Sequence, residues 1–231
     1  MKSTNNFAVA FDAYGTLFDV HSVTALAESL FPGKGYELSG TWRAKQLEYC
    51  FLRSLGGRYE DFWEITQSAL QYTAEKLQLN LAPGSQDRLM AAYLSLAPFP
   101  ENLSVLKAIK DLGGKLAILS NGNQTMLDHL VRNAGMEGLF TYVLSVDQVK
   151  KYKPDPQVYQ MACNAFSLPA QQINFVSSNG WDVSGATWFG FDTFWVNRQS
   201  SPVERLGVAP HGMGQSLTDL LNHLRGTITS V

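Results

Sequence analysis

Four short clusters of polar residues carry the kinds of side chain that enzymes use for chemistry, and each follows a short apolar run. The clusters are Asp12-Ala-Tyr-Gly-Thr16, Ser120-Asn121-Gly122, Lys150-Lys-Tyr-Lys-Pro154 and Ser177-Ser-Asn-Gly-Trp-Asp182. They supply carboxylates for nucleophilic attack or proton transfer, an ammonium group for charge stabilisation, and hydroxyls and amides for hydrogen bonding. One polar loop is usually a solvated turn, but four such loops after strands indicate a ligand site.

The residues of the first two clusters also have structural interpretations. Asp12 is compatible with a helix N-cap, a position that Asp commonly occupies. Its place between an apolar run and the turn residues Gly15-Thr16 instead favours a nucleophile presented on a tight turn. Ser120 and Asn121 suit a turn or an N-cap as well as a site.

The last two clusters are ambiguous in the same way. Lys153 is compatible with a surface lysine, but its position before Pro154 and after a strand favours a role in the site. Asp182 is compatible with the cap of a helix that begins near Val183, with an ion-pair partner of Lys153, or with both. Trp181 by its type alone is more typical of a core residue than of a ligand wall.

The elements that must position these clusters are strands that alternate with helices, which predicts a parallel sheet. The apolar runs that indicate strands span residues 7–11, 116–119, 142–144, 173–176 and 194–196. In an open parallel sheet, ligands bind outside the carboxyl ends of the strands. The four polar clusters are therefore expected along one edge of one sheet.

Residues 20–97 have a different pattern, with helical spacing and no convincing strand. The stretch is punctuated by Gly56-Gly57 and Pro83-Gly84 and is followed by Pro98. It is interpreted as a helical cap inserted after the first strand, and the α/β core domain is expected to comprise residues 1–19 and 98–231. A cap above the carboxyl edge of the sheet would exclude water from the site.

The composition excludes several other classes of protein. The 231 residues include 18 Lys and Arg against 20 Asp and Glu, and this net charge of −2 argues against a nucleic-acid partner. Two cysteines are too few for a disulfide framework, which favours a reducing cytoplasm. No apolar stretch approaches the roughly 18 residues of a membrane span, and the N-terminus lacks the features of a signal peptide. The four histidines have no metal-ligand spacing.

The combined layout resembles the haloacid dehalogenase superfamily, and within it the S-specific 2-haloacid dehalogenases. The resemblance covers nearly the whole chain and rests on Phe11-Asp-Ala-Tyr-Gly-Thr-Leu-Phe-Asp-Val20, Leu116-Ala-Ile-Leu-Ser-Asn-Gly122, Tyr152-Lys-Pro-Asp155 and Phe175-Val-Ser-Ser-Asn-Gly-Trp-Asp182. The last of these is the most specific to the dehalogenases. The segments Trp42-Arg-Ala-Lys-Gln-Leu-Glu-Tyr49 and Leu52-Arg-Ser-Leu55 also look like theirs. The resemblance implies a Rossmann-like core with a helical cap.

Two departures from the phosphatases of this superfamily favour a dehalogenase. The phosphatases carry a second Asp where this chain has Tyr14, and that Asp protonates the leaving alkoxide, which a halide does not need. They also bind Mg²⁺ through a carboxylate in the fourth motif, where this chain has Ser177-Ser178-Asn179. We therefore expect no metal and no other cofactor.

Residue by residue, the resemblance implies that Asp12 is the nucleophile, which forms an ester with C2 of a 2-haloacid anion and inverts that carbon. It implies that Thr16 orients Asp12, and that Ser120 and Lys153 bind the substrate carboxylate. Lys153 in turn would be held by Tyr159 and Asp182. A negatively charged nucleophile and substrate about 4 Å apart repel each other by about 4 kcal/mol at an effective dielectric constant of 20, so nearby cations are needed.

The resemblance also assigns the halide, the water and the pocket. The halide would lie against Arg43 and Asn121 with Phe62 nearby, although Arg43 judged alone is typical of an exposed helical arginine. The hydrolytic water would be placed and activated by Ser177, Asn179 and Asp182. The pocket would be walled by Tyr14, Leu47, Phe62 and Trp181. Ala44, where close relatives often carry Gln, is a departure that leaves the preferred substrate size open.

The resulting hypothesis is hydrolysis of short-chain (S)-2-haloalkanoic acids to (R)-2-hydroxyalkanoic acids by a cytoplasmic enzyme, a homodimer by family resemblance. The group that activates the water stays open, because Lys153 can fully occupy Asp182. The alternatives are a small-metabolite phosphatase of the same superfamily and a non-catalytic binding protein with the same fold.

Overall fold

The computed structural model, which describes residues 7–229, contains a parallel sheet of six strands in the order β3-β2-β1-β4-β5-β6. The strands are β1 Phe7–Phe11, β2 Gly114–Ser120, β3 Tyr142–Ser145, β4 Ile173–Ser177, β5 Asp192–Val196 and β6 Gly212–Gly214. The parallel α/β architecture predicted from the sequence is thereby confirmed. All five predicted strands form, with ends that shift by up to two residues.

The sixth strand, β6, was not predicted. It reads Gly-Met-Gly and pairs with β5 at the edge of the sheet. Its sequence has neither an apolar run nor the β-branched residues that favour strands. Pairing with β5, rather than local preference, holds this segment extended.

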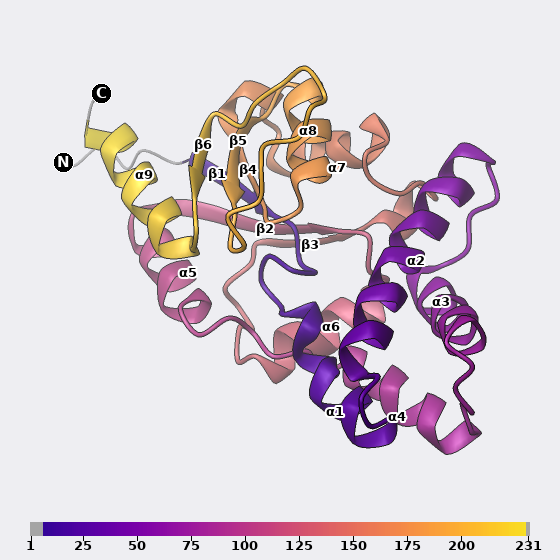
Figure 1. The fold of residues 1–231 in the computed structure, drawn as a ribbon. Helices are drawn as coiled ribbons and strands as arrows, with labels where there is room; N and C mark the ends of the chain where they lie inside the picture. Colours follow the sequence, from indigo (N-terminus) through magenta and orange to yellow (C-terminus); the bar gives the residue numbers. More distant parts are fainter. Residues whose placement is uncertain (1–6, 230–231) are drawn as a thin grey trace.

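Helices cover both faces of the sheet and extend beyond one of its ends (Figure 1). The α-helices are α1 Thr24–Leu30, α2 Gly35–Leu55, α3 Phe62–Lys76, α4 Pro83–Tyr93, α5 Asn102–Asp111, α6 Gln124–Asn133, α7 Pro156–Phe166, α8 Gly180–Phe189 and α9 Leu217–Thr229. Short 3₁₀ helices span Val20–Val23, Val146–Gln148 and Ala170–Gln172. Helices α7 and α8 pack together on one face, and α5 and α9 pack together on the other.

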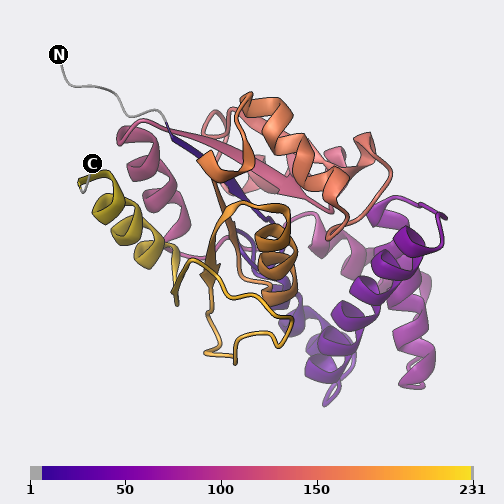
Figure 2. The same cartoon turned by 90° about the horizontal axis from the view of Figure 1, so that it is seen from above.

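Helices α1 to α4 lie together at one end of the molecule, opposite α9, in both views (Figures 1 and 2). They lie between β1 and α5 in the chain, so residues 20–97 are helical as predicted. Asp61 begins α3 as an N-cap, and its side chain accepts hydrogen bonds from the backbone N–H groups of Trp63 and Glu64. Residues 1–6 and 230–231 of the predicted core domain lie outside the described residues, and the boundary between core and cap stays a prediction.

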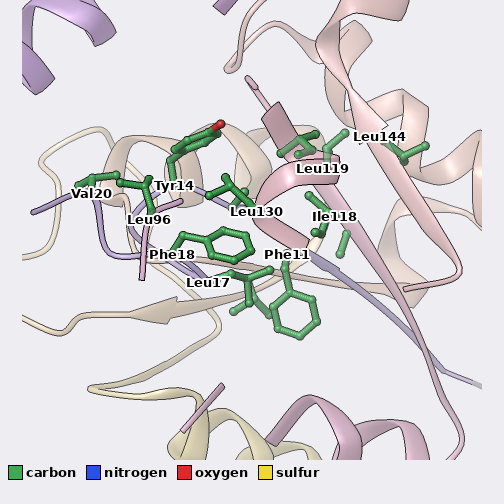
Figure 3. Packing of buried hydrophobic residues seen from close by; sticks show 14 of the residues in the cluster. Phe11, Tyr14, Leu17, Phe18, Val20, Leu96, Ile118, Leu119, Leu130 and Leu144 are labelled. Atoms are coloured by element: carbon green, nitrogen blue, oxygen red, sulfur yellow. The ribbon is translucent and has the colours of Figure 1, made fainter. Parts of the chain in front are cut away.

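The core is centred on β1, which lies between β2 and β4. A central parallel strand is covered on both faces, which explains its continuous apolar sequence. Figure 3 shows Phe11 of β1 beside Leu17 and Phe18, with Ile118 and Leu119 of β2 close by. The turn that follows β1 is therefore anchored in the core on both sides of Asp12.

Candidate active site

Asp12 stands on a tight turn at the carboxyl end of the central strand. Its backbone N–H still donates to the carbonyl of Val176 in β4, at 2.9 Å, so the residue continues the sheet by one position. Gly15 then adopts a left-handed φ of +91°, and a Cβ there would lie 3.1 Å from Oγ of Ser178. Glycine is needed at this position because the chain both turns left-handed and passes close to Ser178.

Three side chains donate hydrogen bonds to the Asp12 carboxylate, which is only 5% exposed. Nζ of Lys153 lies 3.1 Å from Oδ1, and Oδ2 accepts from Nδ2 of Asn179 at 2.9 Å and from Oγ1 of Thr16 at 3.0 Å. The hydroxyl of Thr16 in turn accepts from the backbone N–H of Ser178 at 2.8 Å. The carboxylate is thus held in one orientation by three elements of the chain.

Lys153 bridges two carboxylates. Its Nζ lies 2.9 Å from Oδ2 of Asp182, and all three side chains are buried. The hydroxyl of Tyr159 donates to Oδ1 of Asp182 at 2.8 Å. Tyr159 therefore holds Asp182, which holds Lys153. A Cβ at Gly185 would lie 2.7 Å from the Tyr159 hydroxyl, so a glycine there makes room for this contact.

Burial and charge shift these groups in ways that keep Lys153 positive. Burial by itself would lower the pKa of Lys153, but the carboxylates of Asp12 and Asp182 outweigh it and raise that pKa. Burial raises the pKa of Asp182, while the ammonium of Lys153 opposes the shift. Burial, followed by the nearby charge of Asp182, raises the pKa of Tyr159, which therefore stays a hydrogen-bond donor.

Ser120, Asn121 and Ser177 are buried and bond to the backbone around the site. Oδ1 of Asn121 accepts from the backbone N–H of Lys153 at 3.0 Å, which fixes the loop that carries the lysine. Oγ of Ser120 accepts from Gly122 N–H, and Oγ of Ser177 accepts from Asn179 N–H, both at 3.1 Å. The structure therefore brings these three residues to the carboxyl edge of the sheet.

Arg43 of α2 reaches the site from the helical layer, which is the group of helices α1 to α4. Its Nη2 lies 3.5 Å from the backbone carbonyl of Tyr14, and its Nη1 donates to Oε1 of Gln46 at 2.7 Å. Arg43, Leu47 and Asn179 line one cavity of about 490 Å³. Because Asn179 also bonds to Asp12, this cavity adjoins the buried carboxylate.

The predicted pocket residues fall into two groups. Tyr14 packs on Phe62, with ring centroids 5.0 Å apart. Trp181 instead packs on Phe51 and, with Lys153, lines a second cavity of about 470 Å³. The structure therefore does not place Tyr14, Leu47, Phe62 and Trp181 along one cavity: Leu47 lines the first, Trp181 lines the second, and Tyr14 and Phe62 line neither.

Two details differ from what the sequence suggests. Helix α8 begins at Gly180 with Asn179 as N-cap, so Asp182 does not cap a helix near Val183 and instead points into the core toward Lys153. Ser178 and Gln46 were not singled out as site residues, although they contact Thr16 and Arg43. Gln46 was detectable in principle, because residues three apart on a helix lie on the same face.

The side chains of the site offer few ligands for a metal ion. Within residues 7–229, no group of three or more His, Cys, Asp or Glu residues lies close enough to hold one. The ammonium of Lys153 lies between the carboxylates of Asp12 and Asp182. Both cysteines, Cys50 and Cys163, are free and buried. None of the helices in the described range has the length and apolar character to cross a membrane.

The fold and the site define a class: a parallel α/β protein with a buried carboxylate on the turn after its central strand, held by a lysine. The chain belongs to the haloacid dehalogenase-like hydrolases, whose family model matches residues 8–190. The resemblance in the sequence motifs is thereby confirmed.

Individual relatives narrow this class. The chain is 49% identical to the (S)-2-haloacid dehalogenase of Pseudomonas sp. (strain YL), over 87% of each chain. It is 47% identical to the haloacetate dehalogenase H-2 of Moraxella sp. (strain B), over 88% of this chain and 91% of the relative.

Solved structures of L-2-haloacid dehalogenases also match the fold of this chain. An L-2-haloacid dehalogenase, RSc1362, matches with a TM-score of 0.94 at 52% identity, over 95% of this chain and 98% of the other. The L-2-haloacid dehalogenase of Xanthobacter autotrophicus with chloropropionic acid covalently bound matches with a TM-score of 0.89 at 39% identity, with the same coverage.

Proposed function

We propose that this protein hydrolyses short-chain (S)-2-haloalkanoic acids to (R)-2-hydroxyalkanoic acids, with Asp12 as nucleophile and without a metal ion. One observation carries the proposal: the Asp12 carboxylate accepts hydrogen bonds from Lys153, Asn179 and Thr16 at the carboxyl edge of the sheet. The names of the relatives, and the covalently bound chloropropionic acid in one of them, support the same chemistry.

In the first step an oxygen of Asp12 attacks C2 of the substrate from the side opposite the halogen. The new C–O bond forms as the carbon–halogen bond breaks, the halide leaves with the bonding electron pair, and C2 is inverted. Lys153 and Arg43 offset the repulsion between the Asp12 and substrate carboxylates, and Arg43 with Asn121 receives the halide.

In the second step water attacks the carboxyl carbon of the Asp12 ester. The bond between that carbon and the ester oxygen breaks, so the product keeps an Asp12 oxygen as its hydroxyl, and one proton is released. Ser177, Asn179 and Asp182 place and activate this water in the proposal. Ser120 and Lys153 bind the substrate carboxylate in the proposal. Of the four residues expected to wall the pocket, Leu47 lines the cavity beside Arg43, and Trp181 lines the cavity beside Lys153.

The charges of the site support the proposal that no metal ion is needed. Lys153 supplies the positive charge between Asp12 and Asp182, and a divalent cation between them would have to displace a buried ammonium. A halide leaves without a proton, so the absence of an acid at Tyr14 is no obstacle. We further propose that residues 20–97 act as the cap and that the enzyme is a homodimer, as the family resemblance implies. The low number of cysteines, two in the chain, favours a cytoplasmic location.

The test is chloride release from each enantiomer of 2-chloropropionate in EDTA, measured beside hydrolysis of p-nitrophenyl phosphate with Mg²⁺. We expect release from the S enantiomer alone, at a rate that EDTA does not change. No release, together with Mg²⁺-dependent phosphatase activity, would contradict the proposal and favour the phosphatase alternative.

A further inference from the structure

The guanidinium of Arg43 is held by a neutral side chain. Gln46, three residues further along α2, is fully buried, and its Oε1 accepts from Nη1 of Arg43 at 2.7 Å. No salt bridge reaches Arg43 anywhere in residues 7–229. A neutral amide can orient the guanidinium without cancelling its charge, whereas a carboxylate at position 46 would form an ion pair with it.

The amide of Gln46 is itself oriented by Thr66 of α3. Its Nε2 donates to Oγ1 of Thr66 at 2.6 Å, and the Thr66 hydroxyl lies 2.6 Å from the backbone carbonyl of Phe62. A hydroxyl has one hydrogen, and here it points to that carbonyl, so Oγ1 must accept from Gln46. The nitrogen of the amide therefore faces Thr66, and its oxygen faces Arg43.

This chain of hydrogen bonds ends at the cavity that adjoins the Asp12 carboxylate. Arg43 lines the cavity of about 490 Å³ together with Asn179, which bonds to Asp12. An arginine side chain has several rotatable bonds, so an unheld guanidinium would sample many positions. Here Gln46 holds the guanidinium of Arg43 at the cavity wall, and Thr66 holds Gln46. The positive charge of Arg43 stays available to an anion.

We propose that Gln46 and Thr66 are positioning residues, which hold the guanidinium of Arg43 where the halide leaves. This inference rests on the proposed dehalogenase function. Leaving-group stabilisation matters more for chloride than for bromide, because the carbon–bromine bond breaks more readily. A loss of this positioning must therefore slow the chloro substrate more than the bromo substrate.

The first experiment compares Thr66→Val with Thr73→Val. Thr73 is a matched control, because it lies on the same helix, is fully buried, and bonds through its hydroxyl only to the carbonyl of Ala69 in the same way. We expect Thr66→Val to lower kcat/KM for (S)-2-chloropropionate by about tenfold or more, and for (S)-2-bromopropionate by clearly less. Thr73→Val should leave kcat/KM unchanged for both substrates. Thr66→Ser keeps the hydroxyl and should have kcat/KM values close to those of the wild-type protein for both.

The second experiment is a double-mutant cycle with Gln46→Leu. If Thr66 acts through Gln46, the variant with both Gln46→Leu and Thr66→Val should lose no more kcat/KM on the chloro substrate than Gln46→Leu alone. Additive losses would show that Thr66 acts independently, which would overturn the relay. Melting temperatures of all variants identify any loss that comes from unfolding.

The outcomes separate the two proposals. Equal losses on the chloro and bromo substrates, or no loss in a folded Thr66→Val protein, overturn the positioning role while the dehalogenase function stands. Halide release by neither the wild-type protein nor any variant overturns the proposed function, and the positioning role falls with it.

Discussion

At the scale of single residues, the site is a balance of buried charges. Lys153 carries one positive charge between the carboxylates of Asp12 and Asp182. Removing the lysine would leave both carboxylates buried without a cation, and breaking a buried pair in this way typically costs 3–5 kcal/mol, with about the same expected here. Removing one carboxylate is milder, because Lys153 keeps the other. Asp12 can therefore be tested by substitution without losing the fold.

We predict that Asp12→Asn lowers halide release from (S)-2-chloropropionate by about 10³-fold or more, because a neutral amide is a poor nucleophile. The control is Asp61→Asn at the N-cap of α3, where Asn caps equally well and activity should persist. Halide release is measured on protein that mass spectrometry shows has not deamidated to Asp. Wild-type rates from such a preparation of Asp12→Asn would exclude Asp12 as the nucleophile.

At the scale of elements, two distant segments bond to the backbone of the turn that follows Asp12. Nδ2 of Asn102, at the start of α5, donates to the carbonyl of Leu17 at 2.8 Å and to that of Thr16 at 3.3 Å. Arg198, which follows β5, donates to the Thr16 carbonyl at 3.2 Å and pairs with Glu101. The backbone of the turn is thus fixed at the carbonyls of Thr16 and Leu17.

Replacing Asn102 with Ala should therefore cost both stability and rate. Asn102 is fully buried, and its removal leaves the Leu17 carbonyl without this donor, so we expect a loss of about 1–3 kcal/mol in the free energy of unfolding. Displacement of Thr16 should also lower kcat by about tenfold. Urea unfolding and steady-state kinetics measure the two effects. Asn133→Ala, which removes an exposed bond to the Leu94 carbonyl, is the control, and equal effects of the two substitutions would argue against a brace at Asn102.

At the scale of the whole molecule, the helical layer is fastened to the loop that carries Lys153. Oγ of Ser54, near the end of α2, accepts from the backbone N–H of Tyr152 at 2.6 Å. The hydroxyl of Tyr152 donates to the carbonyl of Glu60 at 2.6 Å, and Tyr59 bonds to Asp147. The pKa values of Tyr59, Tyr152 and Lys153 are all raised in the folded protein, and such shifts set the response of the molecule to alkaline pH.

Stability is predicted to fall above about pH 10. Burial raises the pKa of five tyrosines, which are Tyr14, Tyr59, Tyr93, Tyr152 and Tyr159. The flanking carboxylates raise the pKa of Lys153 against the effect of its burial. Because the folded pKa values lie above the unfolded ones, the unfolded chain releases these protons first. Each group then lowers the free energy of unfolding by about 1.4 kcal/mol per pH unit above its unfolded pKa of about 10.

Urea unfolding at pH 8 and at pH 11 measures this dependence. Tyr14→Phe should make this dependence on pH shallower, because the variant lacks one of the six groups. The Tyr14 hydroxyl has no hydrogen-bond partner to lose among the described residues. Tyr36→Phe, at a side chain that is 84% exposed, is the matched control. An unchanged free energy of unfolding at pH 11 would contradict the prediction.

The pattern of the sequence was enough to predict the parallel α/β architecture and the polar residues that surround Asp12. Apolar runs of strand length identify buried parallel strands, and the polar clusters after them must meet because carboxyl ends of parallel strands share one edge. Asp12, Thr16, Lys153, Asn179 and Asp182 were predicted in this way. In the structure, Thr16, Lys153 and Asn179 bond to Asp12, and Lys153 also bonds to Asp182. The pattern of apolar residues reflects burial, so prediction from it works for elements, such as the central strands, whose structure depends on burial.

Which side chains of distant segments contact one another depends on tertiary packing and could not be predicted from the sequence pattern. Lys153 lies 141 residues from Asp12 in the chain, and nothing local in either segment specifies a distance of 3.1 Å. The strand β6, the relay from Thr66 through Gln46 to Arg43, and the separation of Trp181 from the cavity beside Arg43 were likewise beyond the sequence pattern. The physical reason is that patterns record what each segment prefers, whereas contacts between distant segments depend on how side chains of particular size pack when the whole core closes.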